Sequence, residues 1–410
     1  IDESHVVALC ATYLKPGDIS AVALFELNRA KDWTDFNRAL AKFQGPQQNF
    51  AYADTAGNVG FLTAGLVPIR GQGQGYVPNI GWSGEADWTG MVPFAELPKI
   101  YKPASDIIVN ANNRIAPPGF RYFLGYDWAV PYRARRIRQL LGDETSQSVA
   151  TVGHMQHDAH SLMADELLPL MLDVKVKERM ATKTLHLLRR WNRIMERGKA
   201  EPLIFMAWLL ELNRALYGDE LGNLTNAFLS TRPLLVKSIL TRRQHWCDDI
   251  STKDKQETCA DILFRSFDAA VKGLAKRHGD DQTTWRWGTE HKASFANQVL
   301  GQVPVLGALA NLKIESDGGN ATVNRGAMSL NNQAQPFAHI HGPGYRAVYD
   351  LNDLKRSRFT IATGQSGNPF SSHYRDQMEP WRNGRTFRIT GSRRELSEGV
   401  GFVLAPVGGK

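Results

Sequence analysis

The sequence predicts an α+β protein in which a large helical region separates two β-rich parts. Short apolar runs bounded by turn residues dominate residues 1–130, helical periodicity dominates residues 131–283, and β-type runs return over residues 284–410. With 410 residues, 42% of them hydrophobic and 22% charged, the chain has the length and composition for a large globular core. We expect the two outer parts to share one sheet system that the helices cover.

The first part is predicted to open with a strand and a helix. Val6–Tyr13 is an apolar, strand-like run, and Cys10 within it is expected in the core. Apolar residues recur near helical spacing between Ala23 and Leu40, which predicts a helix over residues 20–43.

A hairpin and a glycine-rich loop follow in the first part. Residues 50–53 and 59–62 are predicted strands, and the residues between them, Asp54-Thr-Ala-Gly-Asn58, supply the turn. Residues 71–88 are rich in glycine and have little periodicity, which suits an active-site or surface loop.

The middle part is predicted to be helical. Apolar residues recur at helical spacing over residues 133–141, 151–174, 177–196, 202–216 and 259–278. Cys247 and Cys259 bracket a very polar loop, and a disulfide closing it would contribute roughly 2–4 kcal/mol of stability. We expect this disulfide rather than two unpaired thiols, and it favours an oxidising compartment.

The last part returns to short strands punctuated by glycine and proline. The predicted strands are residues 322–326, 345–350 and 358–363. The chain shows no internal repeat and no low-complexity tract.

Charge and hydropathy argue against two classes of partner. The net charge of +8 comes from 49 basic and 41 acidic residues, and part of the excess lies in residues 133–138 and 175–197. No recognition motif or aromatic stacking platform accompanies this basic face, so we favour a solvated helix surface over a nucleic-acid site. No run of about 18 apolar residues is present, so we expect no membrane span. The chain begins at Ile1 without Met, from which we expect that an upstream segment was removed.

The histidine motifs do not predict a metal site. His154, His157 and His160 recur every three residues, but the outer two would lie about 9 Å apart along a helix axis, too far to share one zinc ion. His339 and His341 would share one face of a strand, and no third ligand is near in sequence. We therefore interpret both groups as structural and expect no metal.

Nor does the chain offer a convincing nucleophile. Gly364-Gln-Ser-Gly367 lacks the G-x-S-x-G spacing of a serine-hydrolase elbow. Asn368-Pro369 also disfavours the helix that should follow such an elbow. We interpret this segment as a turn.

A possible oxyanion donor lies where the apolar run Ile107–Val109 meets two adjacent amides. We expect this run to be a buried strand ending at Asn110, with Asn112 and Asn113 just beyond it. An Asn side chain directed at a developing oxyanion can contribute roughly 3–4 kcal/mol to acyl transfer. The alternative is that Asn112 and Asn113 only end the strand and bond local backbone, and the residues alone favour this alternative.

A resemblance to a known family changes this balance. The chain resembles the penicillin acylase family of N-terminal-nucleophile hydrolases, and specifically the C-terminal two-thirds or so of its β chain. The motifs that carry the resemblance are Gln48–Asp54, Gly57–Gly60, Gly65–Arg70, Gly81–Pro98, Asn110–Arg114, Tyr132–Ile137, Trp287–His291, Gly301–Pro304, Thr322–Gly326, His341–Gly344 and Thr363–Trp381. The resemblance implies that the predicted sheets and helices form part of an αββα sandwich.

The resemblance also implies roles for individual residues. Asn112 matches the oxyanion-hole Asn of the family, and Arg133 matches the Arg that organises the site. Gln48 matches an acyl-pocket position that is aliphatic in phenylacetyl-type acylases. The family's calcium site is not expected, because Tyr122 stands where a carboxylate ligand is expected. No cofactor is implied.

The implied activity is hydrolysis of the linear amide of an N-acyl substrate, such as a penicillin or cephalosporin side chain, an acyl-homoserine lactone or a lipopeptide. In the family a precursor cleaves itself and exposes an N-terminal Ser whose α-amine, with a pKa of roughly 7.7–8, acts as base. That Ser, the first part of the β chain and the α chain would lie outside this chain, which we therefore expect to be inactive alone. A periplasmic or secreted location is implied. The alternative is a non-catalytic binding or interaction protein of the same fold.

Overall fold

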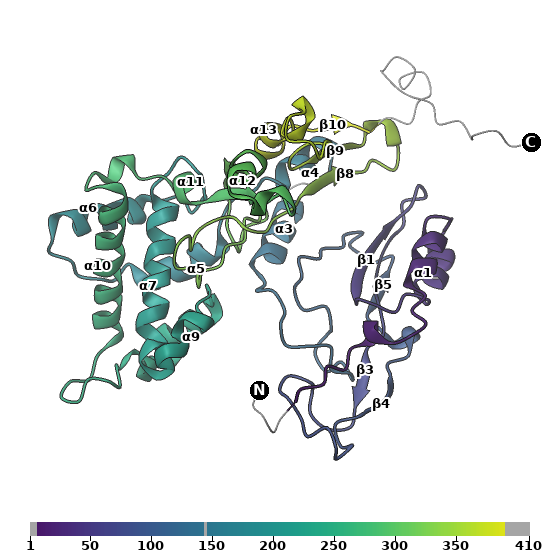
Figure 1. Cartoon of the computed structure of the whole chain (residues 1–410), viewed down its shortest axis with the longest axis horizontal. Helices are drawn as coiled ribbons and strands as arrows, with labels where there is room; N and C mark the ends of the chain where they lie inside the picture. Colours follow the sequence, from purple (N-terminus) through teal and green to yellow (C-terminus); the bar gives the residue numbers. More distant parts are fainter. Residues whose placement is uncertain (1–5, 143–145, 390–410) are drawn as a thin grey trace, which may run out of the picture. The chain divides into compact units, whose positions relative to one another are not determined.

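The structure, a computed structural model, describes residues 6–142 and 146–389. The chain divides into two compact units, Ile1–Pro131 (unit 1) and Tyr132–Lys410 (unit 2) (Figure 1). The sequence-based division into residues 1–130, 131–283 and 284–410 stays a prediction.

Unit 1 is a small α+β unit. Its helices and strands are η1 (Thr12–Leu14), α1 (Ser20–Leu27), α2 (Trp33–Leu40), β1 (Gln48–Ala53), β2 (Val59–Ala64), β3 (Pro68–Arg70), β4 (Trp88–Met91), η2 (Phe94–Glu96) and β5 (Lys99–Tyr101). One antiparallel sheet has the order β1-β2-β5, and β3 pairs with β4. The predicted hairpin is confirmed, with Gln48 opposite Ala64 and Ala53 opposite Val59.

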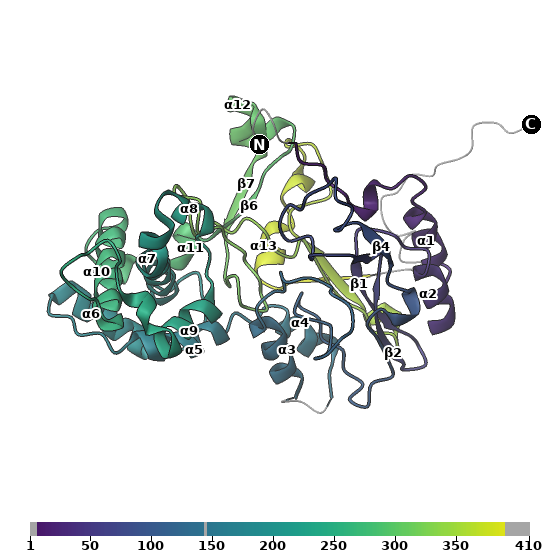
Figure 2. The same cartoon turned by 90° about the horizontal axis from the view of Figure 1, so that it is seen from below.

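The core of unit 1 lies between its two helices and the β1–β2 hairpin. Phe36 and Leu40 of α2 pack with Leu62 and Ala64 of β2, which explains why α1 and α2 lie along one side of this sheet (Figure 2). Trp33 stacks on Tyr101 of β5 with the ring centroids 4.7 Å apart. These contacts bury the apolar face of an otherwise exposed three-stranded sheet.

Two predictions for the start of unit 1 are wrong. The single helix predicted over residues 20–43 is two helices, because the Asp32 carboxylate accepts a hydrogen bond from Asp35 N at 2.8 Å and begins α2 as an N-cap. Val6–Tyr13 is not a strand: the part of it that the structure describes has no partner strand, and Leu9 is 72% exposed. Cys10 is accordingly an exposed free thiol rather than a core residue.

Unit 2 combines many helices with short strands. Its helices are α3 (Tyr132–Gly142), α4 (Val149–Met155), α5 (Leu162–Met171), α6 (Arg179–Arg190), α7 (Glu201–Leu221), η3 (Gly222–Leu224), α8 (Thr225–Phe228), α9 (Pro233–Arg242), η4 (Gln244–Cys247), α10 (Cys259–His278), η5 (Gln282–Thr284), α11 (Trp287–Glu290), η6 (Leu300–Gln302), α12 (Pro304–Ala310), η7 (Leu354–Arg356), η8 (Ser372–Tyr374) and α13 (Met378–Arg382). Its strands are β6 (Lys292–Phe295), β7 (Leu312–Glu315), β8 (Tyr345–Val348), β9 (Arg358–Ile361) and β10 (Phe387–Arg388). Antiparallel pairing gives the sheets β10-β9-β8 and β6-β7.

The helical core of unit 2 is centred on α7, which lies beside α10 (Figures 1 and 2). Trp208 of α7 is fully buried, donates from Nε1 to Ser266 Oγ at 3.1 Å, and contacts the Phe267 ring. Helix α10 confirms the helix predicted over residues 259–278. It begins there because Thr258 and Asp261 form a capping box. The predicted Cys247–Cys259 disulfide is also confirmed, and it ties η4 to the first residue of α10.

Two other predictions for unit 2 are wrong. The helix predicted over residues 151–174 is broken between α4 and α5, where the Ser161 hydroxyl accepts from Ala164 N at 3.1 Å and begins a new helix. Residues 322–326 are not a strand. The Thr322 hydroxyl accepts from Gly319 N and donates to Asn324 O, and these bonds fold the segment into a tight loop.

The membrane prediction can be compared only with helices in the part of the chain that the structure describes. None of those helices has both the length and the apolar composition that a membrane span requires.

Candidate functional site

The predicted site residues belong to both units. Gln48 and Asn112 lie in unit 1, and Arg133 lies in unit 2. The surroundings of each residue are therefore described within its own unit.

Gln48 is the first residue of β1, and its side chain is exposed. The preceding Gln47 instead lines a cavity of unit 1 and donates from Nε2 to Thr12 Oγ1 at 3.2 Å and to Leu66 O. Adjacent side chains of an extended segment point to opposite sides, so the two glutamines cannot serve the same cavity wall.

The sequence predicted a buried strand just before Asn112, and the structure has none there. Residues 107–110 are irregular, Ile107 is 42% exposed, and Asn112 adopts a left-handed backbone with φ of 61°. A β-strand cannot continue through that conformation, and Asn is one of the few residues that tolerates it. The backbone is held in place because Asn112 O accepts from Ala129 N at 3.0 Å and Asn112 N donates to Asn110 Oδ1 at 3.2 Å.

The neighbouring amides serve local backbone. Asn113 Oδ1 accepts from Ala111 N at 3.1 Å, and its Nδ2 donates to Arg114 O. The alternative interpretation of this segment, local backbone bonding, thus describes Asn110 and Asn113. The Asn112 side chain is exposed.

An aromatic cleft lies on the segment that is bonded to Asn112. Two adjoining cavities of about 380 and 450 Å³ share residues 123–126 and Trp128 as lining. The Tyr126 ring contacts Tyr76 edge-on and Phe123 at a centroid distance of 4.7 Å, and Trp128 Nε1 donates to Gly125 O. Sequence periodicity did not indicate this cleft, although five aromatic residues within residues 120–128 were a visible signal.

Tyr122, which stands where the resemblance implied a carboxylate ligand, is hydrogen-bonded to an acidic side chain. Its hydroxyl donates to Glu96 Oε2 at 2.7 Å, and this bond raises the pKa of Tyr122. Across the described residues, no group of three or more His, Cys, Asp or Glu side chains has the arrangement of a metal site.

Arg133 lies in the first turn of α3 close to a second cation of unit 2. Burial, together with the positive charge of Arg325, lowers the pKa of Arg133 to about 10. Burial also lowers the pKa of Arg325. Two half-buried guanidinium groups that repel each other favour an anion between or beside them.

A buried network supports the loop that carries Arg325. Arg346 is 6% exposed, donates from Nη2 to Asn324 Oδ1 at 2.7 Å and from Nη1 to Trp381 O, and lies over the Trp381 ring. Asn324 N in turn donates to Asp158 O at 2.8 Å. These bonds fix the residue before Arg325, so Arg346 acts as a positioning residue for the second cation.

The histidines of the two motifs lie in several different elements of unit 2. His154 lies in α4, His157 follows that helix, and His160 forms an isolated bridge with Ile194. His339 is buried, stacks on His291 with centroids 5.2 Å apart, and its Nδ1 lies 2.8 Å from Ser316 Oγ. This packing gives both rings a place in the core of unit 2.

Comparison with known proteins gives consistent matches along the chain. The family model for penicillin amidase matches residues 1–398. An acyl-homoserine lactone acylase QuiP of Pseudomonas syringae pv. syringae (strain B728a) is 27% identical over 407 residues, which are 94% of this chain and 49% of that protein. A penicillin acylase 2 proenzyme of Pseudomonas sp. (strain SE83) is 28% identical over 344 residues, 81% of this chain and 42% of that protein.

A solved structure confirms the predicted fold class. The thermostable penicillin G acylase from Alcaligenes faecalis matches with a TM-score of 0.69 and 17% identity, over 95% of this chain and 73% of that chain. The chain spans about half the length of the acyl-homoserine lactone acylases that it matches, 49% in the example given above.

Proposed function

Because the chain belongs to the penicillin amidase family, we propose that it forms part of an amidohydrolase that cleaves the linear amide of an N-acyl substrate. The observation that carries this proposal is the family match over residues 1–398, which includes Gln48, Asn112 and Arg133. The acyl-homoserine lactone and penicillin acylases among the relatives make N-acyl amides the substrate class to test first.

The nucleophile in this proposal is an N-terminal Ser on a segment outside the chain. Its Oγ attacks the amide carbon while its own α-amine accepts the hydroxyl proton. The carbon–nitrogen bond then breaks, and the proton passes to the leaving amine. Water hydrolyses the resulting acyl-serine ester by the same base and releases the carboxylic acid.

Asn112 supplies an oxyanion donor in this scheme. Its Nδ2 group would donate to the carbonyl oxygen as that oxygen gains charge in the tetrahedral intermediate. The left-handed backbone of Asn112 supports this role, because such a conformation at a non-glycine residue costs about 1 kcal/mol and tends to persist where function requires it. The bond from Ala129 N fixes the backbone so that the side chain starts from one position.

Arg133 is proposed to favour an anionic intermediate within unit 2. The repulsion between Arg133 and Arg325 is relieved when negative charge develops nearby, so the pair favours the anionic intermediate over the neutral substrate. Gln48 contacts the acyl group in this proposal, and its amide favours an acyl chain with a polar substituent over a plain aromatic ring.

The polypeptide is proposed to be the product of an exported, self-cleaving precursor. The Cys247–Cys259 disulfide supports export, because disulfides persist in oxidising compartments. An intact-mass measurement on protein purified from the periplasm and from the cytoplasm tests this, since the proposal expects the oxidised, processed form only in the periplasm.

The decisive experiment compares the 410-residue chain with the product of the complete reading frame. Both are incubated with an N-acyl-homoserine lactone and with a phenylacetyl anilide, and the released amine is measured. We expect release only by the complete product, whose mature N-terminus is Ser. Turnover by the 410-residue chain alone would place the nucleophile within it.

Two variants of the complete product test the role of Arg133. Arg133→Met is expected to lower kcat by about tenfold or more, whereas Arg138→Met, an exposed change on the same helix α3, leaves kcat unchanged. A complete product with no Ser, Thr or Cys at the junction and no turnover would support a non-catalytic binding protein instead.

A further inference from the structure

The hairpin of β6 and β7 ends in an apolar tip. The tip comprises residues 297–311, which include η6 and α12 at the end of that hairpin (Figure 2). No charged residue occurs between positions 296 and 312. Val299 is 77% and Val305 is 76% exposed, and further exposed apolar side chains of the tip are Val303, Leu306 and Leu309. Apolar side chains exposed together on so short a segment indicate an interaction surface rather than scattered surface residues.

The polar groups of the tip are turned inward. Asn297 Oδ1 accepts hydrogen bonds from Val299 N at 3.1 Å and from Leu300 N at 2.8 Å, at the start of η6. Asn311 Oδ1 accepts from Asn297 N at 2.9 Å, and Asn311 Nδ2 donates to Gly301 O at 3.2 Å. These bonds satisfy backbone groups of the tip from within, so its outer surface is left to apolar side chains.

The tip is also anchored to the rest of unit 2. Tyr374, which is buried, donates from its hydroxyl to Ala310 O at 2.6 Å and accepts from Asn297 Nδ2 at 3.1 Å. Helix α12 packs tightly on η6, because a Cβ at Gly307 would lie 2.6 Å from Gly301 O. A surface that is held in one conformation before binding loses little conformational entropy when a partner covers it.

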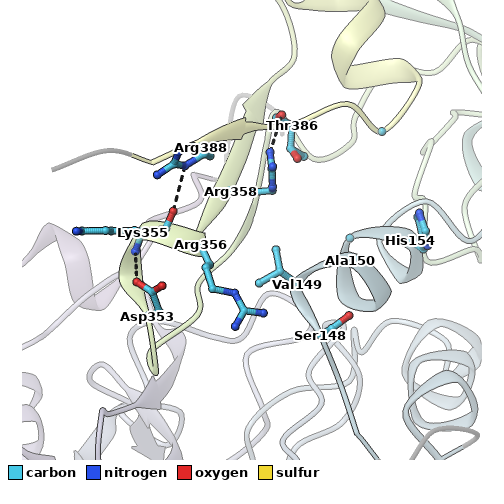
Figure 3. A pocket seen from close by; sticks show the side chains of 12 residues that line it. Ser148, Val149, Ala150, His154, Asp353, Lys355, Arg356, Arg358, Thr386 and Arg388 are labelled. Carbon is cyan, nitrogen blue, oxygen red and sulfur yellow. Dashed lines mark hydrogen bonds between the residues drawn. The ribbon is translucent and has the colours of Figure 1, made fainter. Parts of the chain in front are cut away.

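A cavity elsewhere in unit 2 shows the more usual situation, in which polar groups bond to one another. Its volume is about 630 Å³, and it lies between the start of α4 and the β9–β10 strands (Figure 3). Among its cationic side chains, Arg356 pairs through Nε with Asp350 at 3.2 Å, and Arg388 Nε donates to Lys355 O at 3.4 Å. These contacts satisfy charged groups within the chain, whereas the apolar tip has its exposed side chains directed at solvent.

The composition of the tip favours a protein pocket over a lipid surface. Segments that lie on a bilayer surface typically combine Trp or Phe on one face with Lys or Arg on the other. Residues 296–312 contain none of these four residue types. Val and Leu side chains without charged neighbours suit the core of a protein interface, from which charged residues are depleted.

We propose that the apolar tip inserts into an apolar pocket of the polypeptide that the same reading frame encodes outside this chain. This inference rests on the proposed function, in which that polypeptide carries the nucleophile. The acyl-homoserine lactone acylase that matches 94% of this chain is matched over 49% of its own length, so such a protein has about as much polypeptide again to cover the tip. Synthesis as one precursor also gives the two parts a high effective concentration for docking.

Thiol labelling of Val305→Cys in a Cys10→Ser background tests the docking. The rate of labelling by a maleimide is measured, with the labelled peptide identified by mass, in the 410-residue chain and in the product of the complete reading frame. We expect labelling to be slower by about tenfold or more in the complete product, because thiol reactivity follows exposure. Leu309→Cys repeats the test at a second position of the tip. Lys276→Cys, at an exposed position of α10, is the control and reacts at the same rate in both proteins.

Amine release by the same samples separates this inference from the proposed function. Protection of the new thiol without amine release would support the docking and contradict the proposed function. Amine release without protection would support the function and overturn the docking. Protection that is already present in the 410-residue chain, whether from a second copy or from within the chain, would also overturn it. Slower labelling of the complete product only after phospholipid vesicles are added would assign the tip to a lipid surface instead.

Discussion

Lowering the pH from 7 to 5 is expected to destabilise unit 2 through three histidines. Burial, reinforced by Arg346, lowers the pKa of His157 and His339 to about 4, and burial lowers the pKa of His291 to about 3, against an ordinary value of 6.5. Arg346 Nη1 lies 2.9 Å from His157 Nε2 and requires that ring to be neutral.

The sign of the effect follows from proton linkage. Between pH 6.5 and about 4 these histidines bind protons in the unfolded chain but stay neutral in the folded chain. The free energy of unfolding therefore falls as the pH falls. Each histidine loses roughly 2 kcal/mol between pH 7 and 5, and together they lose about 6 kcal/mol, which is comparable with the whole stability of a domain. Glu220 opposes this loss, because burial raises its pKa to about 7 and its neutral form stabilises the fold at low pH.

Urea unfolding followed by tryptophan fluorescence at pH 7 and pH 5 measures this loss. His157→Gln should remove about a third of it, roughly 2 kcal/mol, whereas His186→Gln, a change at an exposed histidine of α6, should leave it intact. Equal free energies of unfolding at the two pH values would refute the reasoning, because they would mean that the buried rings do not titrate between the two states.

Two further predictions concern stability. Replacing Cys247 and Cys259 with Ala should lower the free energy of unfolding by about 3 kcal/mol, the loop-entropy value for a disulfide with a sequence separation of 12. Cys10→Ser, at an exposed thiol, should not change it, and a double Ala variant as stable as the parent in urea would argue against the bridge. Gly326→Ala should cost about 1–3 kcal/mol or more, because its Cβ would overlap His291 Nε2 and lie 3.1 Å from His339 Nδ1. Gly344→Ala, with no atom within 4 Å of the added Cβ, is the matched control in thermal unfolding, and equal losses from both would contradict this packing.

The sequence predicted elements best where local signals agree. Helix α10 has apolar periodicity, a capping box at Thr258 and a glycine after its last residue, and its predicted bounds are those of the structure. The β1–β2 hairpin has a strong turn signal in Asp54, whose carboxylate accepts from Asn58 N and Ala56 N. In both cases the information lies within a few residues of the element.

The wrong predictions have two other causes. Val6–Tyr13 and Ile107–Asn110 are apolar enough to be strands, but a strand also needs a partner, and sequence pattern does not supply one. The predicted helices over residues 20–43 and 151–174 were each broken by a cap, Asp32 and Ser161 respectively, that periodicity alone does not register. Cap residues inside a periodic run were the signal that could have found both breaks.

Some residues of the candidate site could be predicted from the sequence, and others could not. Asn112 and Arg133 could be named because short motifs resemble a family, whereas local physics alone favoured backbone bonding for the amides. The aromatic cleft and the Arg133–Arg325 pair could not be predicted, because they depend on residues that only tertiary packing brings together.

The central claim is that Asn112 supplies an oxyanion donor, and kcat of the Asn112→Gly variant of the complete enzyme tests it most directly. Glycine keeps the left-handed backbone at φ of 61° and removes only the amide side chain. The account predicts a fall in kcat of about 10²–10³-fold with a smaller change in KM, and no change for Asn79→Ala in the glycine-rich loop. A kcat for Asn112→Gly equal to that of the parent enzyme would contradict it.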